Sequence, residues 1–121
     1  MLFRSEGVES VTCDAGTRYR EQIQRVLAGH KNHMDFLRFC EAQMLWDAAM
    51  AWRLIDFLEA NPGYTVVVLA GGFHSWKHGI PKRVGKIADH PLRVILPSGE
   101  TGSFGFDLTQ EEADYVWWID A

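Results

Sequence analysis

The segment Gly71–Gly79, with the sequence GGFHSWKHG, holds the residue types best suited to bind a ligand. Histidines can ligate a metal or carry a proton, aromatic side chains offer flat apolar faces, and glycines let a ligand approach the backbone closely. The candidate residues are Gly71, Gly72, Phe73, His74, Trp76 and His78. The alternative is that the histidines are ordinary loop residues and the aromatic side chains belong to the core. The segment matches neither a P-loop nor a GxGxxG motif, which argues against a nucleotide cradle.

Two polar residues, Gln43 and Asp47, lie on the apolar side of a long helix predicted over residues 32–60. At about 100° per residue, both fall within an apolar stripe, away from the charged positions. The stripe contains Cys40, Met44, Ala51, Leu54 and Leu58. An unpaired carboxylate would be costly there, so we expect both residues to be buried and hydrogen-bonded near residues 71–79. They either shape that loop, which we favour, or orient a ligand or a ligating histidine.

Other candidate residues favour structural interpretations. Cys13 and Cys40 match no disulfide framework or zinc spacing, and a cysteine in an apolar helical stripe is usually buried and inert. His30 and His33 would need a third donor to hold a metal, so solvated histidines at the start of a helix are favoured. The basic residues of 82–86 are expected to form the solvated face of a surface helix.

Apolar periodicity and end signals predict three helices that would position these residues. Residues 17–27 form the first helix, which ends near Gly29. The second runs over residues 32–60, with Asn32 as its N-cap and an Asn-Pro-Gly stop signal after it. Pro81 begins a third helix that ends at about residue 88.

Three apolar runs predict strands. Residues 64–70 (YTVVVLA) lack polar alternation, which is typical of a central parallel strand covered on both faces. Residues 92–96 form the next strand, in a right-handed βαβ crossover. After a capping box formed by Thr109 and Glu112, residues 115–119 form the last strand. The predicted fold class is α/β: a small three-layer unit with a long helix, then a βαβ crossover with a mainly parallel sheet and a C-terminal strand.

Length and charge restrict the function classes. The 121 residues suffice for a single domain, and the net charge of −4 with scattered basic residues argues against nucleic-acid binding. No apolar run reaches the roughly 18 residues of a membrane span, and the first residues lack the apolar region of a signal peptide. As written, the chain is expected to be soluble and untargeted. Five Trp and seven Phe favour a partner subunit or a cofactor that covers part of the surface.

Three sequence motifs resemble one family. EAQMLWDAAMA at 41–51, VVVLAGGFHSWKHGIPKRV at 66–84 and ADYVWW at 113–118 are similar to the C-terminal portion of the ChaN-like haem-binding uptake family, within the Tiki and erythromycin-esterase-like superfamily. The resemblance extends from about residue 35 to 119. It implies an α/β protein that binds haem, can dimerise and resides in the bacterial cell envelope. The family's loop histidine falls on His74, and its helix polar residues fall on Gln43 and Asp47.

Three functions from different classes follow. The first is a haem-binding module, active in haem or iron uptake, with His74 as the candidate iron ligand. The other candidate cofactor-binding residues are Gly71, Gly72, Phe73, Trp76, His78, Gln43 and Asp47. The second function is a ligand-free structural or interaction domain, and the third is a metal-dependent hydrolase, for which the sequence supplies few ligands. We also expect a homodimer or other self-association, because the aromatic residues of 115–119 face both sides of a small sheet.

Overall fold

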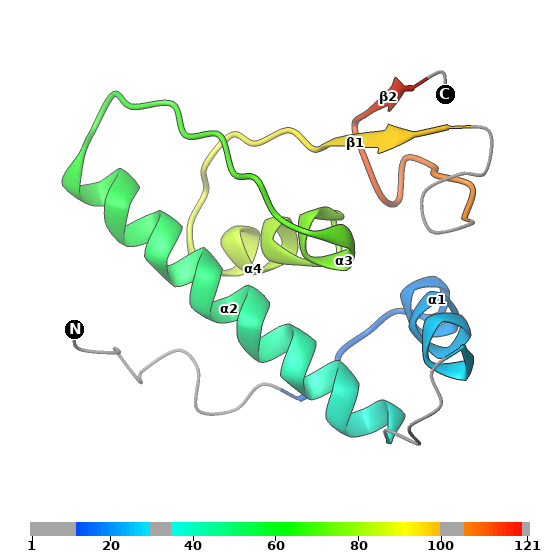
Figure 1. Cartoon of the computed structure of the whole chain (residues 1–121). Helices are drawn as coiled ribbons and strands as arrows, with labels where there is room; N and C mark the ends of the chain where they lie inside the picture. Colours follow the sequence, from blue (N-terminus) through cyan, green and yellow to red (C-terminus); the bar gives the residue numbers. More distant parts are fainter. Residues whose placement is uncertain (1–11, 30–34, 100–105, 120–121) are drawn as a thin grey trace.

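The computed structural model describes residues 12–29, 35–99 and 106–119, which form a mixed α/β fold (Figure 1). The elements in chain order are α1 (Thr17–Ala28), α2 (Phe36–Ala60), α3 (Gly72–Ser75), α4 (Ile80–Ile87), β1 (Ile95–Ser98) and β2 (Tyr115–Trp118). In Figure 1 the long helix α2 forms one layer, α3 and α4 a second, and the two strands a third. The expected α/β class is confirmed.

Helix α2 is the longest element and begins later than expected. The Asp35 side chain, not Asn32, caps it by accepting a hydrogen bond from the Leu37 N–H at 3.1 Å. Asn32 lies outside the described residues. At the other end, Asn61 Nδ2 donates to the Phe57 carbonyl at 2.8 Å, so the expected stop signal is confirmed. No described helix combines the length and the apolar character needed to cross a membrane.

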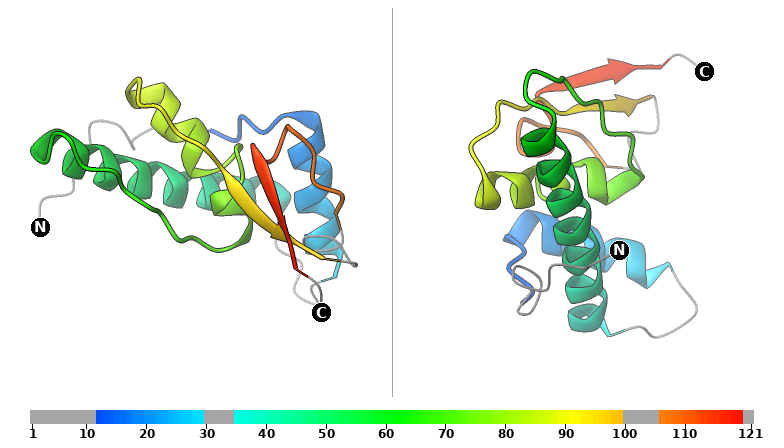
Figure 2. Two further views of the ribbon diagram at one scale, coloured as in Figure 1. Left: turned by 90° about the horizontal axis from the view of Figure 1, so that it is seen from above. Right: turned by 90° about the vertical axis from the view of Figure 1, so that its left-hand side faces the viewer.

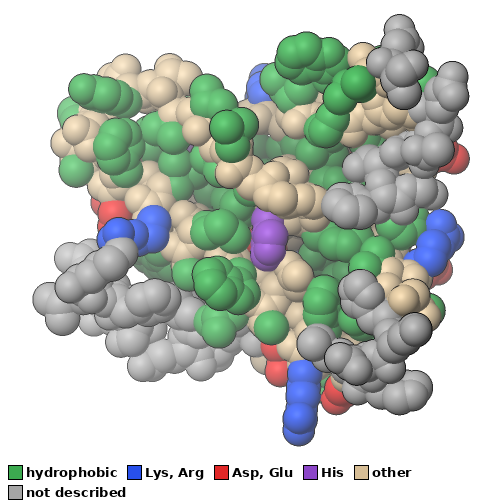
Figure 3. Space-filling view, in the orientation of Figure 1, with side chains coloured by type: hydrophobic (Ala, Val, Ile, Leu, Met, Phe, Trp, Pro, Cys, Tyr) green, Lys and Arg blue, Asp and Glu red, His purple; other side chains and the backbone are tan. Residues whose placement is uncertain are grey.

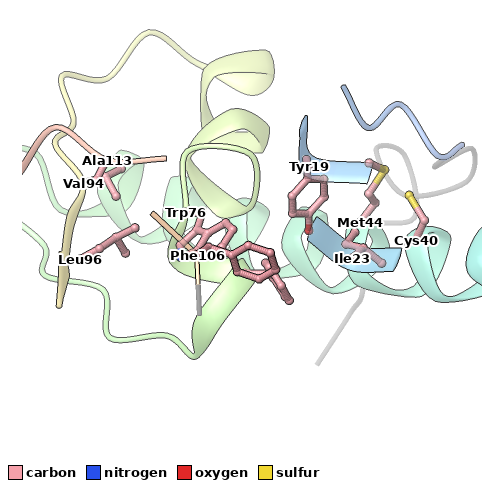
Figure 4. Close-up of a cluster of buried hydrophobic side chains, with 10 residues drawn as sticks. Tyr19, Ile23, Cys40, Met44, Trp76, Val94, Leu96, Phe106 and Ala113 are labelled. Carbon is pink, nitrogen blue, oxygen red and sulfur yellow. The ribbon is translucent and has the colours of Figure 1, made fainter. Parts of the chain in front are cut away.

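Two apolar clusters hold the helices together. In the first, α1 packs on the N-terminal half of α2 and meets residues of the loop and the sheet (Figure 4). Its buried members are Tyr19, Ile23, Cys40, Met44, Phe73, Trp76, Val94, Leu96, Phe106 and Ala113. In the second, Ala51 and Ile55 of α2 pack against Ile80 and Val84 of α4. The views of Figure 2 show α1 and α4 against different parts of α2. The three predicted helices are therefore present and are joined through buried apolar side chains.

The sheet consists of two parallel strands, with Ile95 beside Tyr115 and Ser98 beside Trp118. The last predicted strand is confirmed, and the strand expected at 92–96 begins only at Ile95. Asp114 fixes the start of the pairing, because its Oδ2 accepts from the Val94 N–H at 2.8 Å. The turn before β2 is held as the capping box predicted, with Glu112 Oε2 accepting from the Thr109 N–H at 2.7 Å.

The expectation of a buried central strand at 64–70 is wrong. This segment contains no strand, and no strand of the described residues pairs with it. Leu69 is 93% exposed and Val67 81% exposed. The apolar run alone did not decide its state, because a buried strand needs neighbours on its edges and layers on its faces. The expected βαβ crossover is therefore not formed, and the parallel pair is instead β1 with β2.

The expectation of unpaired cysteines is also wrong, because Cys13 and Cys40 form a disulfide. The extended segment before α1 runs back along α2, which brings their Cα atoms to 5.5 Å. Cys40 is fully buried in the apolar stripe, as predicted. Spacing could not reveal the pair, since only the packing of α1 on α2 brings the two residues together.

Candidate ligand site at the Gly71–Gly79 segment

The Gly71–Gly79 segment is a compact turn structure. Its first half is the helical turn α3, in which the Gly71 carbonyl accepts from the N–H groups of His74 at 3.1 Å and Ser75 at 3.3 Å. Its second half is closed by the Gly79 N–H, which donates to the Trp76 carbonyl at 2.8 Å. These bonds fix the position of His74 relative to α2 and α4.

Gly79 is required where the segment folds back on itself. A Cβ atom there would lie within 3.0 Å of the carbonyl oxygens of Phe73 and His74, closer than real Cβ atoms approach. Gly71 differs, since a Cβ atom on it would meet nothing within 4 Å. Gly79 therefore permits the backbone packing, whereas Gly71 leaves open space beside the segment.

His74 and Asp47 form the central contact of the site. His74 Nδ1 lies 2.6 Å from Asp47 Oδ1. The Asp47 side chain is 1% exposed and the His74 side chain 27% exposed. An ionised carboxylate only accepts hydrogen bonds, so Nδ1 carries the proton and the Nε2 lone pair is available to a ligand. The expected burial of Asp47 and its hydrogen bond at the loop are confirmed.

Other polar groups act on Asp47 from α1 and α4. Burial raises the pKa of Asp47, while the hydrogen bond from His74 and the charge of Arg83 oppose that rise. Burial and the Asp47 charge also raise the pKa of Tyr19, so its hydroxyl stays protonated. The Tyr19 hydroxyl and Arg83 Nε are buried without a hydrogen-bond partner among the described residues. Asp47 thus lies among proton donors from three elements.

Gln43 departs from its expected role. It is half-buried, and within the described ranges its buried Oε1 atom accepts no hydrogen bond. It occupies the expected side of α2, one turn before Asp47, but lacks the expected bond. Of Gln43 and Asp47, only Asp47 therefore forms the expected hydrogen bond with the Gly71–Gly79 segment.

Phe73 and Trp76 are core residues, which is the alternative that the sequence left open. Both are buried, and their ring centroids lie 4.6 Å apart in an edge-to-face contact. Trp76 also contacts Phe106 edge-to-face at 6.0 Å, and Phe73 contacts Tyr19 at 5.9 Å. The Phe73 and Trp76 rings are occupied by these contacts, so they anchor the loop to the core.

His78 points to a different environment from His74. Its ring stacks on Tyr19 with 5.2 Å between centroids, and burial lowers its pKa. It lies close enough to Glu111 and Glu112 for a metal ion to be shared. However, Glu112 already accepts from Arg18, Gln22 and Thr109. Although burial opposes it, these bonds lower the pKa of Glu112 to about 2. The Glu112 oxygens are already used in these bonds, and the Arg18 guanidinium supplies the positive charge that a metal ion would bring.

The basic residues of α4 only partly form the solvated face expected from the sequence, because Lys86 is exposed but Arg83 is not. Arg83 is buried, and its Nη2 donates to Asp14 Oδ1 at 2.7 Å. Lys82 Nζ lies 3.4 Å from the same oxygen, and Lys86 pairs with Oδ2. Burial opposes a low pKa for Asp14, but Lys86, Arg83 and Lys82 outweigh it and lower the pKa. No local signal predicts this cluster, because the partners are far apart in the sequence.

Exposed apolar side chains flank the site residues in the chain. Segment 64–70, whose exposed members include Val67 and Leu69, leads directly into Gly71, and Trp46 beside Asp47 is 65% exposed. Figure 3 shows a histidine side chain near the centre of one face, with hydrophobic side chains to either side. His30 and His33, the other histidines considered as metal ligands in the sequence, lie outside the described residues.

The fold and site define a mixed α/β protein with a solvent-facing histidine held by a buried carboxylate. A family model described as "Haem-binding uptake, Tiki superfamily, ChaN" matches residues 4–84. This is more than half of the chain, so the protein belongs to this family. The match contains both Asp47 and His74 and also includes α1, upstream of the resemblance seen in the sequence. No curated protein and no solved structure gives a significant match.

Proposed function

We propose that the protein is a haem-binding module in which His74 Nε2 ligates the iron. The observation that carries this proposal is the 2.6 Å contact between His74 Nδ1 and the buried Asp47 carboxylate. Metal-ligating histidines commonly donate their second N–H to a carboxylate, which fixes the tautomer and raises ligand basicity. Haem, when bound, supplies an iron centre for which histidine is a common axial ligand.

The surroundings of His74 fit a flat apolar ligand. Segment 64–70, which leads into the loop, and Trp46, which precedes Asp47 in the chain, offer exposed apolar side chains. Gly71 leaves open space at the backbone. We assign Phe73 and Trp76 the role of supporting the loop. Gln43, whose Oε1 is buried, has a structural place on α2 one turn before Asp47. His78 packs on Tyr19 and helps to hold the loop rather than the iron.

The disulfide supports a location outside the reducing cytosol. Disulfides persist in oxidising compartments and are rare in the cytosol of mesophiles. The Cys13–Cys40 bond therefore agrees with the cell-envelope location that the family resemblance implies. This supports a role in haem or iron uptake at the bacterial surface.

We also propose that a second copy of the chain covers the apolar surface of the sheet. All four residues of β2 are exposed, including Trp117 at 71%. Exposed apolar patches of this kind often mark interaction surfaces. Light scattering over a concentration series should give a mass that rises towards a dimer, and a monomer mass at high micromolar concentration would contradict the proposal.

A haem titration followed by visible absorbance tests the ligand site. We expect His74→Ala to weaken haem binding by about tenfold or more, and Asp47→Asn to weaken it by about 10 to 100-fold, since outer partners of metal-binding histidines contribute that much. His90→Ala is the matched control, because His90 lies outside the loop. The His30→Ala/His33→Ala double variant should also bind normally.

The result can distinguish the alternatives. If wild-type protein gives no Soret shift at all, the ligand-free interaction domain becomes the better description, and the exposed apolar surface already favours it as the second candidate. If only the His30/His33 variant loses binding, haem binds elsewhere. The described residues offer little to a metal-dependent hydrolase, because their one cluster of three possible metal ligands, His78 with Glu111 and Glu112, contains the committed Glu112.

A further inference from the structure

Three cations on one short helix converge on a single carboxylate. Lys82, Arg83 and Lys86 of α4 all pair with Asp14, with Arg83 Nη2 at 2.7 Å from Oδ1. Lys82 Nζ also donates to the Asp14 backbone carbonyl at 3.2 Å. Asp14 is the carboxylate that the three cations share, and Arg83 also acts on Asp47 at longer range. Two carboxylates do not neutralise three cations, so the cluster retains positive charge. An anion with two negative charges would match it better than a side-chain carboxylate.

Arg83 makes this cluster more than a surface patch. Its residue exposure is only 9%, and its buried Nε has no hydrogen-bond partner in the described part of the chain. A buried guanidinium without a carboxylate partner is strongly unfavourable. If Asp14 left, Arg83 would therefore favour the entry of another anion. Guanidinium groups bind carboxylates and phosphates with the same fork geometry.

Asp14 is held in the cluster by its neighbours in the chain. Residues 12–16 form no helix or strand, and α1 begins at Thr17. On the other side, Cys13 is bonded to Cys40 of α2. Such a tether gives Asp14 a high effective concentration at the cations. Breaking the disulfide would lower that concentration and let an external anion compete.

We propose that Lys82, Arg83 and Lys86 form a binding site for a dianionic phosphate group, which Asp14 occupies while the Cys13–Cys40 disulfide holds it in place. A dithiol opens the site by thiol–disulfide exchange. One reductant thiolate attacks the disulfide, the S–S bond breaks, and the second reductant thiol completes its own disulfide. Two electrons and two protons pass to Cys13 and Cys40, which become thiols. This site is separate from the proposed haem site and is tested without haem.

Calorimetric titration of the full chain with inorganic phosphate, at fixed ionic strength, tests the proposal. Oxidised wild-type protein should bind weakly. Oxidised Asp14→Asn should bind at least about tenfold more tightly, because the internal competitor is gone. Wild-type protein reduced with dithiothreitol, and the Cys13→Ser/Cys40→Ser variant without reductant, should also bind more tightly than oxidised wild type.

Matched variants identify the cations. In the Asp14→Asn background, Lys82→Ala/Lys86→Ala should abolish the gain, whereas Lys77→Ala should keep it, because Lys77 pairs with Asp114 instead. Titration with phenyl phosphate separates two sources of the ligand: equal binding indicates a phosphate ester, and exclusion indicates free phosphate. Circular dichroism checks that each variant is folded.

Two results would overturn the proposal. The first is an oxidised Asp14→Asn protein that binds phosphate no more tightly than wild type. The second is a folded, reduced wild-type protein whose affinity equals that of the oxidised form. If reduction unfolds the chain, Asp14→Asn and Asp14→Ser in the oxidised state still decide whether the cations form a site.

Discussion

Similar apolar side chains have opposite exposure in two regions of the molecule: the packed helices with the Gly71–Gly79 segment, and the exposed region made of segment 64–70 and strand β2. Where α1, α2, α4 and the Gly71–Gly79 segment face one another, the apolar side chains are buried, although α2 also exposes some on its outer side, Trp46 among them. Segment 64–70 and strand β2 expose most of theirs. A helix satisfies its own backbone and needs cover on one side only. A strand needs partners on its edges and layers on its faces. Helical periodicity therefore identifies the buried side of a helix, whereas an apolar run leaves a strand dependent on what lies beside it.

Replacing one tryptophan in each part gives the largest expected contrast. Trp76 is 1% exposed, so Trp76→Ala should lower the free energy of unfolding by about 3–5 kcal/mol. Trp117→Ala should change it by about 0.5 kcal/mol or less in dilute solution, since the side chain is exposed. Denaturant melts measure both. Similar losses from the two variants would mean that β2 is buried in solution and the contrast does not hold.

Two glycines of the candidate site allow a sharper test of how the loop is packed. Gly79→Ala should destabilise the protein by about 3 kcal/mol, because its Cβ atom would overlap the carbonyls of Phe73 and His74. Gly71→Ala should cost far less, because open space surrounds that position. Thermal melts of the two variants provide the measurement, and equal melting temperatures would contradict the described loop.

Acid should weaken the contact between α1 and the segment before β2. The expected loss of unfolding free energy is smaller, about 2 kcal/mol, as for other hydrogen bonds to a charged group. Glu112 joins the segment before β2 to Arg18 and Gln22 of α1. Its pKa is lowered from 4.5 to about 2 against the opposing effect of burial, so the folded protein binds that proton less readily than the unfolded chain. The stabilisation is complete above about pH 4.5 and is lost as the pH falls towards 2.

The measurement is unfolding free energy between pH 2 and pH 6 for wild type and Glu112→Gln. Asp14 and Asp114 also have lowered pKa values, so some acid sensitivity should remain in the variant. The slope between pH 2 and 4.5 should nevertheless be shallower than in wild type. Identical slopes would show that Glu112 does not link α1 to the segment before β2.

Much of the helical fold could be predicted because its signals are local. The periodicity of residues 17–27 and Pro81 at the start of α4 each depend on neighbours within a few positions. The stop after Ala60 depends on Asn61, whose side chain bonds Phe57 one turn back. The failures have a common cause: segment 64–70 and Cys13 depend on residues distant in the sequence.

The candidate site was predictable in outline. Helical projection placed Asp47 on the side of α2 that faces the core, and an unpaired carboxylate there requires a partner. It did not identify His74 as that partner. Neither did it show that Gln43 would lack one, or that Phe73 and Trp76 would be taken up by the core.

The sequence by itself determined α1, α2 and α4, the mixed α/β class, the family resemblance and the need for a partner at Asp47. Each of these follows from side chains that are close in the chain or on one face of a helix. Only the tertiary structure decided that Asp47 meets His74, that Cys13 meets Cys40, and that Asp14 occupies the cations of α4. These contacts join residues 27 or more positions apart. They form only when packed helices bring distant side chains together, which local pattern does not encode.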